Sequence, residues 1–269
     1  MTAPLIMGVL NVTPDSFSDG GRYESFDDAI AHGLALRDQG AQLIDVGGES
    51  TRPGATRVPV EEEIARVVPV VRELVAAGVT VSVDTMNADT AVAAASAGAT
   101  IINDVSGGLA DPGMYRIVAE TGLEYIAMHW RQAGSHGNDA PVYGDVVAEV
   151  REELKVRLAE MVVWGIDLRK VVLDPGIGFA KSAEHNWRLL GHLPEFATLG
   201  HRLLVGVSRK RFLGALLPEG APTAERDLPT AVLSALAAEA GVWAVRVHDA
   251  ESTRVALATW QALDDGRNA

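Results

Sequence analysis

Polar side chains follow short apolar runs at several places along the chain, and their types suit a small polar ligand. Asp84 follows "VSV", Asn103 follows "II" and Asp174 follows "VVL", while Lys210 lies in "GVSRKRFLG" after another apolar run. A polar group that ends an apolar run needs partners, because a buried unsatisfied group costs about 1–3 kcal/mol. Two carboxylates, a carboxamide and a lysine together suit a planar heterocycle with alternating hydrogen-bond donors and acceptors.

A second group of side chains suits an anion. Arg52 follows the second apolar run, and Arg246 and His248 lie in the eighth, so they can meet at one anion if those runs end at the same edge of a sheet. Ordinary structural roles compete with these assignments. Asp174 precedes a Pro-Gly turn and can form that turn or cap a helix, and Arg246 can form an ion pair across neighbouring helices. Arg211 can be a solvated charge, so the residue types alone leave both interpretations open.

Eight short apolar runs, each followed by a segment with helical periodicity, must position these side chains. The runs are too uniformly apolar for a sheet with one face in water, which indicates a parallel sheet covered by helices. Eight such units in 269 residues fit a closed barrel, in which the loops after the strands face one cavity. We predict an α/β fold, a single (β/α)8 TIM barrel forming one domain over residues 1–269. The predicted strands are 5–12, 43–48, 81–85, 101–107, 125–130, 171–176, 203–208 and 244–248, and the predicted helices are 26–40, 59–78, 87–98, 111–122, 144–165, 182–193, 225–241 and 249–263.

The composition excludes several classes of protein and site. The chain has no cysteine, which rules out disulfides, thiolate metal ligands and cysteine nucleophiles. Its formal net charge of −13 argues against nucleic acid and anionic membranes as partners. The first apolar run is far shorter than the ~20 residues that a membrane span requires, so we expect a soluble, cytoplasmic protein. The segment "PGIGFAKS" is not a phosphate-binding P-loop, because Pro175 and Ala180 occupy the two glycine positions relative to Lys181.

Taken in order, seven segments of this chain resemble the dihydropteroate synthase family. They are "GVLNVTPDSFSDGG", "GGESTRPG", "SVDT", "INDVSG", "LDPGIGFAK", "SRKRFLG" and "RVH". The first two are highly specific together, whereas "SVDT" and "INDVSG" recur across the wider group of pterin-binding barrels. The resemblance extends from residue 5 to about residue 260.

The resemblance implies a (β/α)8 barrel that joins 6-hydroxymethyl-7,8-dihydropterin diphosphate to 4-aminobenzoate and releases pyrophosphate. The implied catalytic residues are Asp84, Asp174, Lys210, Arg52, Arg246 and His248. The pterin would contact Asp84, Asn103, Met128, Asp174, Phe179 and Lys210. The diphosphate would be held by Asn11, Thr51, Arg52, Arg246 and His248, with Mg²⁺ as cofactor on Asn11 and the phosphate oxygens. The aminobenzoate would lie near Phe17, Thr51, Pro53, Lys210 and Arg211, and sulfonamides would compete there.

The resemblance also gives a role to the loop "NVTPDSFSDGG" (11–21), which is more polar than a simple turn requires. A dissociative reaction would pass through a cation that reacts with water, so the cavity must be closed while the cation exists. Gly20 and Gly21 would permit hinge motion of such a lid, and Phe17 would face the aminobenzoate ring. Many family members carry serine directly after the lysine of "SRK". This chain has Arg211 there, which leaves the aminobenzoate carboxylate contact open.

Two alternative functions remain at this point. A methyltetrahydrofolate-dependent methyltransferase shares the pterin-reading barrel but needs neither a diphosphate cluster nor this lid. A non-catalytic pterin-binding paralogue would keep the same residues without turnover. The family is usually dimeric through its last helices, and "PTAVLSALAAEAG" (229–241) has the small apolar surface of such an interface, although ordinary packing on the barrel explains it equally well.

Overall fold

Eight parallel strands close into a barrel, with neighbours in the order β1-β2-β3-β4-β5-β6-β7-β8 and β1 paired with β8. The computed structural model describes residues 2–12, 22–49, 57–131 and 142–268, the side chains of 22–25 excepted. The strands are β1 (Leu5–Asn11), β2 (Leu43–Gly47), β3 (Val81–Asp84), β4 (Ile101–Asp104), β5 (Glu124–Met128), β6 (Val171–Asp174), β7 (Arg202–Val205) and β8 (Ala244–Val247). The predicted (β/α)8 architecture is confirmed.

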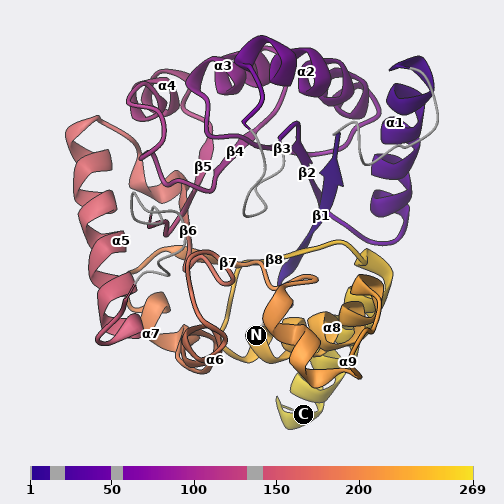
Figure 1. Ribbon diagram of the computed structural model, residues 1–269, viewed down its shortest axis with the longest axis vertical. Coiled ribbons are helices and arrows are strands. Elements are labelled where there is room, and N and C mark those ends of the chain that lie inside the picture. Colours follow the sequence, from indigo (N-terminus) through magenta and orange to yellow (C-terminus); the bar gives the residue numbers. More distant parts are fainter. Residues whose placement is uncertain (1, 13–21, 50–56, 132–141, 269) are drawn as a thin grey trace.

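Helices surround the barrel and cover the outer face of the strands (Figure 1). They are α1 (Arg22–Asp38), α2 (Val60–Ala76), α3 (Ala88–Ser96), α4 (Met114–Thr121), α5 (Val146–Val163), α6 (Ala183–Gly191), α7 (Leu193–Ala197), α8 (Asp227–Glu239) and α9 (Ala250–Asn268), with short 3₁₀ turns η2 (Leu168–Lys170), η3 (Arg211–Leu216) and η4 (Thr223–Arg226). The prediction missed α7 and the 3₁₀ turns. Over the described ranges, no helix is both long enough and apolar enough to cross a membrane.

Helices pack on the strands through their apolar faces, as α2 shows. In α2 the buried residues include Val67, Val70, Val71 and Leu74. Their spacing of three and four positions places them on one helical face. The exposed face of α2 begins with Glu61 and Glu62, which are favourable near a helix N-terminus. The core between helices and strands therefore fixes the orientation of each strand, and with it the side that faces the barrel interior.

The barrel interior has an apolar floor and a polar upper layer. The floor is a separate buried cluster made of Met7, Leu43, Ile101, Ile126, Val172, Leu204 and Ala244. Side chains alternate between the two faces of a strand, so the residue two positions further along faces the same interior. Those positions hold Asp45, Asn103, Met128, Asp174 and Arg246 on β2, β4, β5, β6 and β8. The same alternation that builds the floor therefore delivers polar side chains to the barrel mouth.

Candidate active site

The strand register brings the predicted site residues to one level at the carboxyl ends of the strands. Asn11 pairs with Gly47, Gly47 with Asp84, and Asp84 with Asn103 across β1 to β4. On the other side of the barrel, Met128 pairs with Asp174. In α/β barrels, this end of the strands is where ligands bind.

A guanidinium and two carboxylates form the centre of the cluster. Arg246 Nε lies 2.6 Å from Asp45 Oδ2, and Arg246 Nη2 lies 2.8 Å from Asp84 Oδ2. Asn103 donates from Nδ2 to the same Asp45 oxygen at 3.0 Å. Arg246 thus forms an ion pair inside the barrel and not across neighbouring helices. Asp45 is a residue that sequence reasoning missed, although an aspartate within the apolar run "LIDVGG" was an available signal.

The two carboxylates each retain an oxygen atom without a hydrogen bond. Asp45 Oδ1 and Asp84 Oδ1 are buried, and neither has a partner among the described residues. Burial raises the pKa of Asp84, and the nearby charges of Asp45 and Glu63 act in the same direction, while the charge of Arg246 opposes them. A buried acceptor without a donor is costly. The arrangement therefore favours a ligand that presents N–H groups.

Asp174 lies across the mouth from this cluster and combines two roles. Its Oδ1 accepts the Gly176 N–H at 2.7 Å, so the turn-forming interpretation is correct for one oxygen. A Cβ placed on Gly206 would lie 3.9 Å from Asp174 Oδ2 and 3.8 Å from Arg246 Cβ, so both side chains border the space above that glycine. Burial raises the pKa of Asp174 to about 6, against the Gly176 N–H and the charge of Lys210.

Lys210 and Phe179 meet beside Asp174. The Lys210 ammonium lies 3.8 Å from the centroid of the Phe179 ring, which is within range of a cation–π contact. Burial and the charge of Arg246 lower the pKa of Lys210 to about 8. Arg211, the next residue, is exposed. Met128 is buried at the end of β5.

His248 is oriented by Ser208, which lies in the turn after β7. The Ser208 hydroxyl accepts the backbone N–H of His248 at 3.1 Å and lies 2.8 Å from its ring Nδ1. The neighbouring Arg209 has a left-handed backbone (φ 58°) and a two-point ion pair with Asp227 at 2.8 and 2.7 Å. The turn that carries Lys210 is therefore anchored to α8.

Of the other predicted residues, some lie in the part of the chain that the structure describes and some lie outside it. Asn11 Oδ1 and Asp84 Oδ2 both lie 3.8 Å from the point where a Gly47 Cβ would stand, so Asn11 belongs to the same mouth. Asp104, next to Asn103, has a structural role, because its carboxylate accepts hydrogen bonds from Ser106, Gly108 and Tyr125. The predicted positions Phe17, Thr51, Arg52 and Pro53 lie outside the described residues.

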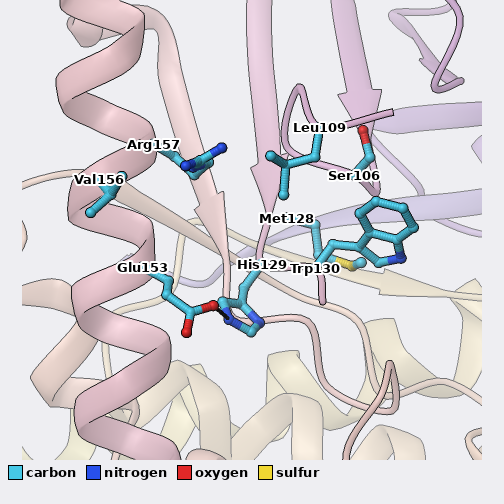
Figure 2. A pocket seen from close by; sticks show the side chains of 8 residues that line it. All are labelled: Ser106, Leu109, Met128, His129, Trp130, Glu153, Val156 and Arg157. Atoms are coloured by element: carbon cyan, nitrogen blue, oxygen red, sulfur yellow. Dashed lines mark hydrogen bonds and ion pairs between the residues drawn. The ribbon is translucent and has the colours of Figure 1, made fainter. Parts of the chain in front are cut away.

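A small cavity lies beside the mouth rather than within it. Its volume is about 120 Å³, and it separates α5 from β5 and the turn after β4 (Figure 2). Figure 2 shows His129 turned toward Glu153 of α5, with Met128 and Trp130 on the opposite side. The lining residues are Ser106, Leu109, Met128, His129, Trp130, Glu153, Val156 and Arg157.

A closed parallel barrel with carboxylates, an amide and a lysine at its mouth defines an enzyme scaffold that binds a small polar ring. Known proteins agree with this assignment. The sequence profile described as "Pterin binding enzyme" matches residues 7–248. The dihydropteroate synthase of Mycobacterium leprae is 54% identical over 257 residues, covering 94% of this chain and 90% of that protein.

Solved structures give the same result. The dihydropteroate synthase of Xanthomonas albilineans with 4-aminobenzoic acid has a TM-score of 0.91 at 46% identity, covering 97% of this chain and 93% of that one. The Yersinia pestis enzyme in a sulfonamide drug complex has a TM-score of 0.90 at 40% identity, covering 98% and 95%. The chain belongs to the pterin-binding enzymes and, among them, to the dihydropteroate synthase family. The predicted activity, that of a transferase in folate biosynthesis, is confirmed at this level.

Proposed function

We propose that this chain condenses 6-hydroxymethyl-7,8-dihydropterin diphosphate with 4-aminobenzoate to give 7,8-dihydropteroate and pyrophosphate. The observation that carries the proposal is the pair of buried oxygens, Asp45 Oδ1 and Asp84 Oδ1, that have no hydrogen-bond partner in the described part of the chain. A pterin edge carries adjacent N–H donors, which supply what these oxygens need. Gly47 and Gly206, which lie between the polar side chains, keep the mouth free of side-chain bulk.

The pterin is recognised by charge-assisted hydrogen bonds over an apolar floor. Asp84 and Asp174 accept N–H groups of the ring, Asn103 pairs with a further edge atom, and Lys210 donates to an acceptor on the opposite side. Met128 and Phe179 pack against the ring. Asp45 adds to the predicted set, because its Oδ2 holds both Asn103 and Arg246 in place while its Oδ1 accepts a further N–H of the ring.

The reaction follows a dissociative course, because an aromatic amine is a weak nucleophile. The bond between the methylene carbon and the diphosphate oxygen breaks first, and its electron pair leaves with pyrophosphate. The resulting cation is delocalised into the dihydropterin ring, where the charges of Asp84 and Asp174 stabilise it. Arg246 and His248 stabilise the charge that grows on the pyrophosphate, as Arg52 would from outside the described residues. The amine nitrogen then bonds to the methylene carbon and loses a proton to water.

The donor set fits the expected Mg²⁺. In the described ranges, no cluster of three or more acidic or histidine side chains forms a dedicated metal cage. Mg²⁺ at phosphate sites needs no such cage, because it keeps waters and takes one or two protein oxygens together with the phosphates. Asn11 would supply its Oδ1 from the end of β1. When bound, the ion neutralises negative charge on the diphosphate.

A homodimer through α8 is part of the same proposal. Leu228, Val232 and Leu236 are exposed by 71%, 51% and 60%, and they recur every four positions along α8. Such a spacing forms one apolar stripe on the helix surface, which suits a second copy of the same helix. We also propose that sulfonamides compete with 4-aminobenzoate, as the Yersinia pestis complex supports, and that the enzyme acts in the cytoplasm.

The deciding experiment measures pyrophosphate release by the purified protein with Mg²⁺ and the pterin diphosphate, with and without 4-aminobenzoate. Release that depends on aminobenzoate and yields dihydropteroate, and that Lys210→Ala abolishes, supports the proposal. Tight pterin binding without release would identify a non-catalytic paralogue instead. Methyl transfer from methyltetrahydrofolate to a corrinoid protein, without pyrophosphate release, would identify the methyltransferase.

A further inference from the structure

The chain has four lysines, and two of them lie at the barrel mouth. Lys155 and Lys170 are exposed, whereas Lys181, in the loop between β6 and α6, and Lys210, after β7, are partly buried. The proposed function uses Lys210 only. Lys181 lies in the segment that does not match a P-loop, and the proposed function gives it no role. Its side chain makes more hydrogen bonds than that of Lys210.

The Lys181 ammonium has a complete set of acceptors. It donates to the carbonyl of Gly176 at 3.0 Å and to the carbonyl of Phe179 at 3.1 Å, and it lies 3.1 Å from His129 Nδ1. When Lys181 is charged, its ammonium group has three N–H donors and no lone pair, so Nδ1 is then the acceptor and the ring proton lies on Nε2. That proton points to Glu153 at 2.9 Å, the contact drawn as a dashed line in Figure 2.

This arrangement connects three elements that meet at the mouth. His129 follows β5, Glu153 lies on α5, and Lys181 is the last residue before the α6 cap. Glu153 also accepts from Arg131 Nε at 3.0 Å, so the carboxylate is held independently of the histidine. Glu153 of α5 therefore orients His129, and His129 in turn holds the Lys181 ammonium.

The loop that Lys181 holds needs such a tie. Gly176, Gly178 and Ala180 all have left-handed backbones, with φ of 71°, 81° and 48°. For alanine this conformation costs on the order of 1 kcal/mol, so the surrounding contacts must maintain it. Gly176 also approaches the chain after β5 closely, because a Cβ there would lie 2.2 Å from the His129 carbonyl oxygen. The loop backbone therefore packs closely against the chain after β5 on one side and against the Lys210 side chain on the other.

We propose that Lys181 is a positioning residue for pterin binding, whose ammonium fixes the Phe179 carbonyl and thereby the plane of the Phe179 ring. The ring is then held from two sides, by Lys181 through its backbone and by Lys210 through its face at 3.8 Å. This inference rests on the proposed function, which places the pterin against Phe179 and Lys210. Lys181 touches neither substrate and acts through Phe179.

A double-mutant cycle tests this role. Lys181→Met keeps the side-chain length and removes the donors, and binding of 6-hydroxymethylpterin is measured by calorimetry in the Phe179 and Phe179→Ala backgrounds. We expect Lys181→Met to weaken binding about tenfold when Phe179 is present and less than about twofold when it is not, because residues that act through each other are not additive. The KM for 4-aminobenzoate should change less than the KM for the pterin diphosphate.

The matched control is Lys170→Met, which removes an exposed lysine from the entry to β6 and should leave pterin binding unchanged. Thermal unfolding of every variant separates weakened binding from loss of fold. If Lys181→Met does not fold, Lys181→Gln, which retains two donors, goes through the same cycle with a smaller expected coupling.

Equal weakening in both backgrounds would overturn the inference, because a merely structural lysine would act whether or not Phe179 is present. Wild-type protein that binds no pterin would overturn the proposed function and this inference with it. Wild-type binding with additive variants would overturn only the inference.

Discussion

At the residue scale, the site concentrates acidic groups whose charge is costly until a ligand arrives. Asp174 shows this cost in its pKa, which burial raises to about 6. A raised carboxyl pKa means that the folded state binds the proton more tightly than the unfolded state does. The resulting stabilisation is complete below the unfolded pKa of about 4 and is lost as the pH rises through about 6.

The first prediction concerns the pH dependence of pterin binding. Protonation of Asp174 as the pH falls through about 6 removes a charged acceptor, so pterin affinity should fall toward acid pH. Lys210, Lys181 and Arg246 also face this carboxylate, and Asp84 contributes its own raised pKa. In Asp174→Asn, calorimetry from pH 5 to 8 should show a pH slope smaller by about one proton.

Two further measurements complete that test. Asp174→Asn keeps an oxygen for the Gly176 N–H, and by the sign just given it should unfold at a higher temperature than wild type at pH 7. The control is Asp167→Asn. It removes a carboxylate that precedes β6, at the end of the strand opposite Asp174, and it should leave the pH slope of pterin binding as it is in wild type. An Asp174→Asn slope equal to that of wild type would remove Asp174 from the pterin site.

A second prediction at this scale concerns Ser208. Its oxygen accepts the His248 backbone N–H and lies 2.8 Å from His248 Nδ1. We predict that its hydrogen is donated to Nδ1, which would place the ring proton on Nε2. Ser208→Ala should remove that preference and weaken inhibition by pyrophosphate by about threefold to tenfold. Nitrogen NMR of labelled histidine would report the tautomer directly. Ser208→Thr keeps the hydroxyl and should behave as wild type, and a His248 tautomer unchanged in Ser208→Ala would contradict the assignment.

At the element scale, the loop between β6 and α6 packs so closely against the Lys210 side chain that little space remains between them. Gly178 has φ of 81°, and a Cβ on it would lie 2.7 Å from Lys210 Cδ. Gly178→Ala should therefore both strain the backbone and displace Lys210 from the Phe179 ring. We expect a loss of about 1–2 kcal/mol in stability and a raised KM for the pterin diphosphate.

The control for that substitution is Gly165→Ala at the end of α5. Gly165 has a similar φ of 77°, but a Cβ there would meet nothing within 4 Å. It should show the backbone cost in thermal unfolding without any change in KM. Equal KM values for the two variants would mean that the loop does not set the position of Lys210.

The limits of sequence reasoning also become clear at this scale. The strands were predictable because apolar runs of uniform character, each followed by helical periodicity, permit few folds other than a barrel. The predicted helix 182–193 corresponds to α6, and the prediction missed α7, which begins directly after His192 and contains a proline in its first turn. Such a short helix has too few residues for a periodic signal.

Site residues could be predicted from the sequence where they follow an apolar run that forms a strand. They could not be predicted where their role depends on contacts with residues far away in the chain. Asp84, Asn103 and Asp174 follow apolar runs, which predicts a common edge. Asp45 binds Asn103 and Arg246, which are 58 and 201 positions away in the chain, so its apolar run indicates a buried aspartate but not the residues that it binds. The sequence indicated Lys181 only as part of a segment that does not match a P-loop. Its partners are backbone carbonyl groups, which every residue has, so only the folded loop shows which of them it binds.

At the scale of the whole molecule, an exposed apolar stripe lies on α8, on the outer surface of the barrel. α8 and α9 pack side by side next to β8 and β1 (Figure 1). The stripe Leu228, Val232 and Leu236 remains uncovered within one chain. If the proposed dimer forms through α8, replacing Val232 with glutamate should convert it to monomer in sedimentation experiments, because a charge in an apolar interface loses its hydration.

The control for this prediction is Val163→Glu on α5, at a position that is 86% exposed and away from α8. It should leave the sedimentation coefficient unchanged. A Val232→Glu protein that sediments like wild type would show that α8 does not carry the interface. Because Asp227 of α8 anchors Arg209 beside Lys210, the monomer should also be assayed for turnover.

The distribution of lysines has a practical consequence for handling the enzyme. Lys155 lies on the outer helix α5, and Lys170 lies directly before β6, at the end of the barrel opposite the mouth. Amine-reactive supports and dyes require an accessible side chain, so coupling through lysine side chains would occur at these two positions. An immobilised preparation would then hold the barrel with its mouth free of the support, and substrate would reach it as it does in solution.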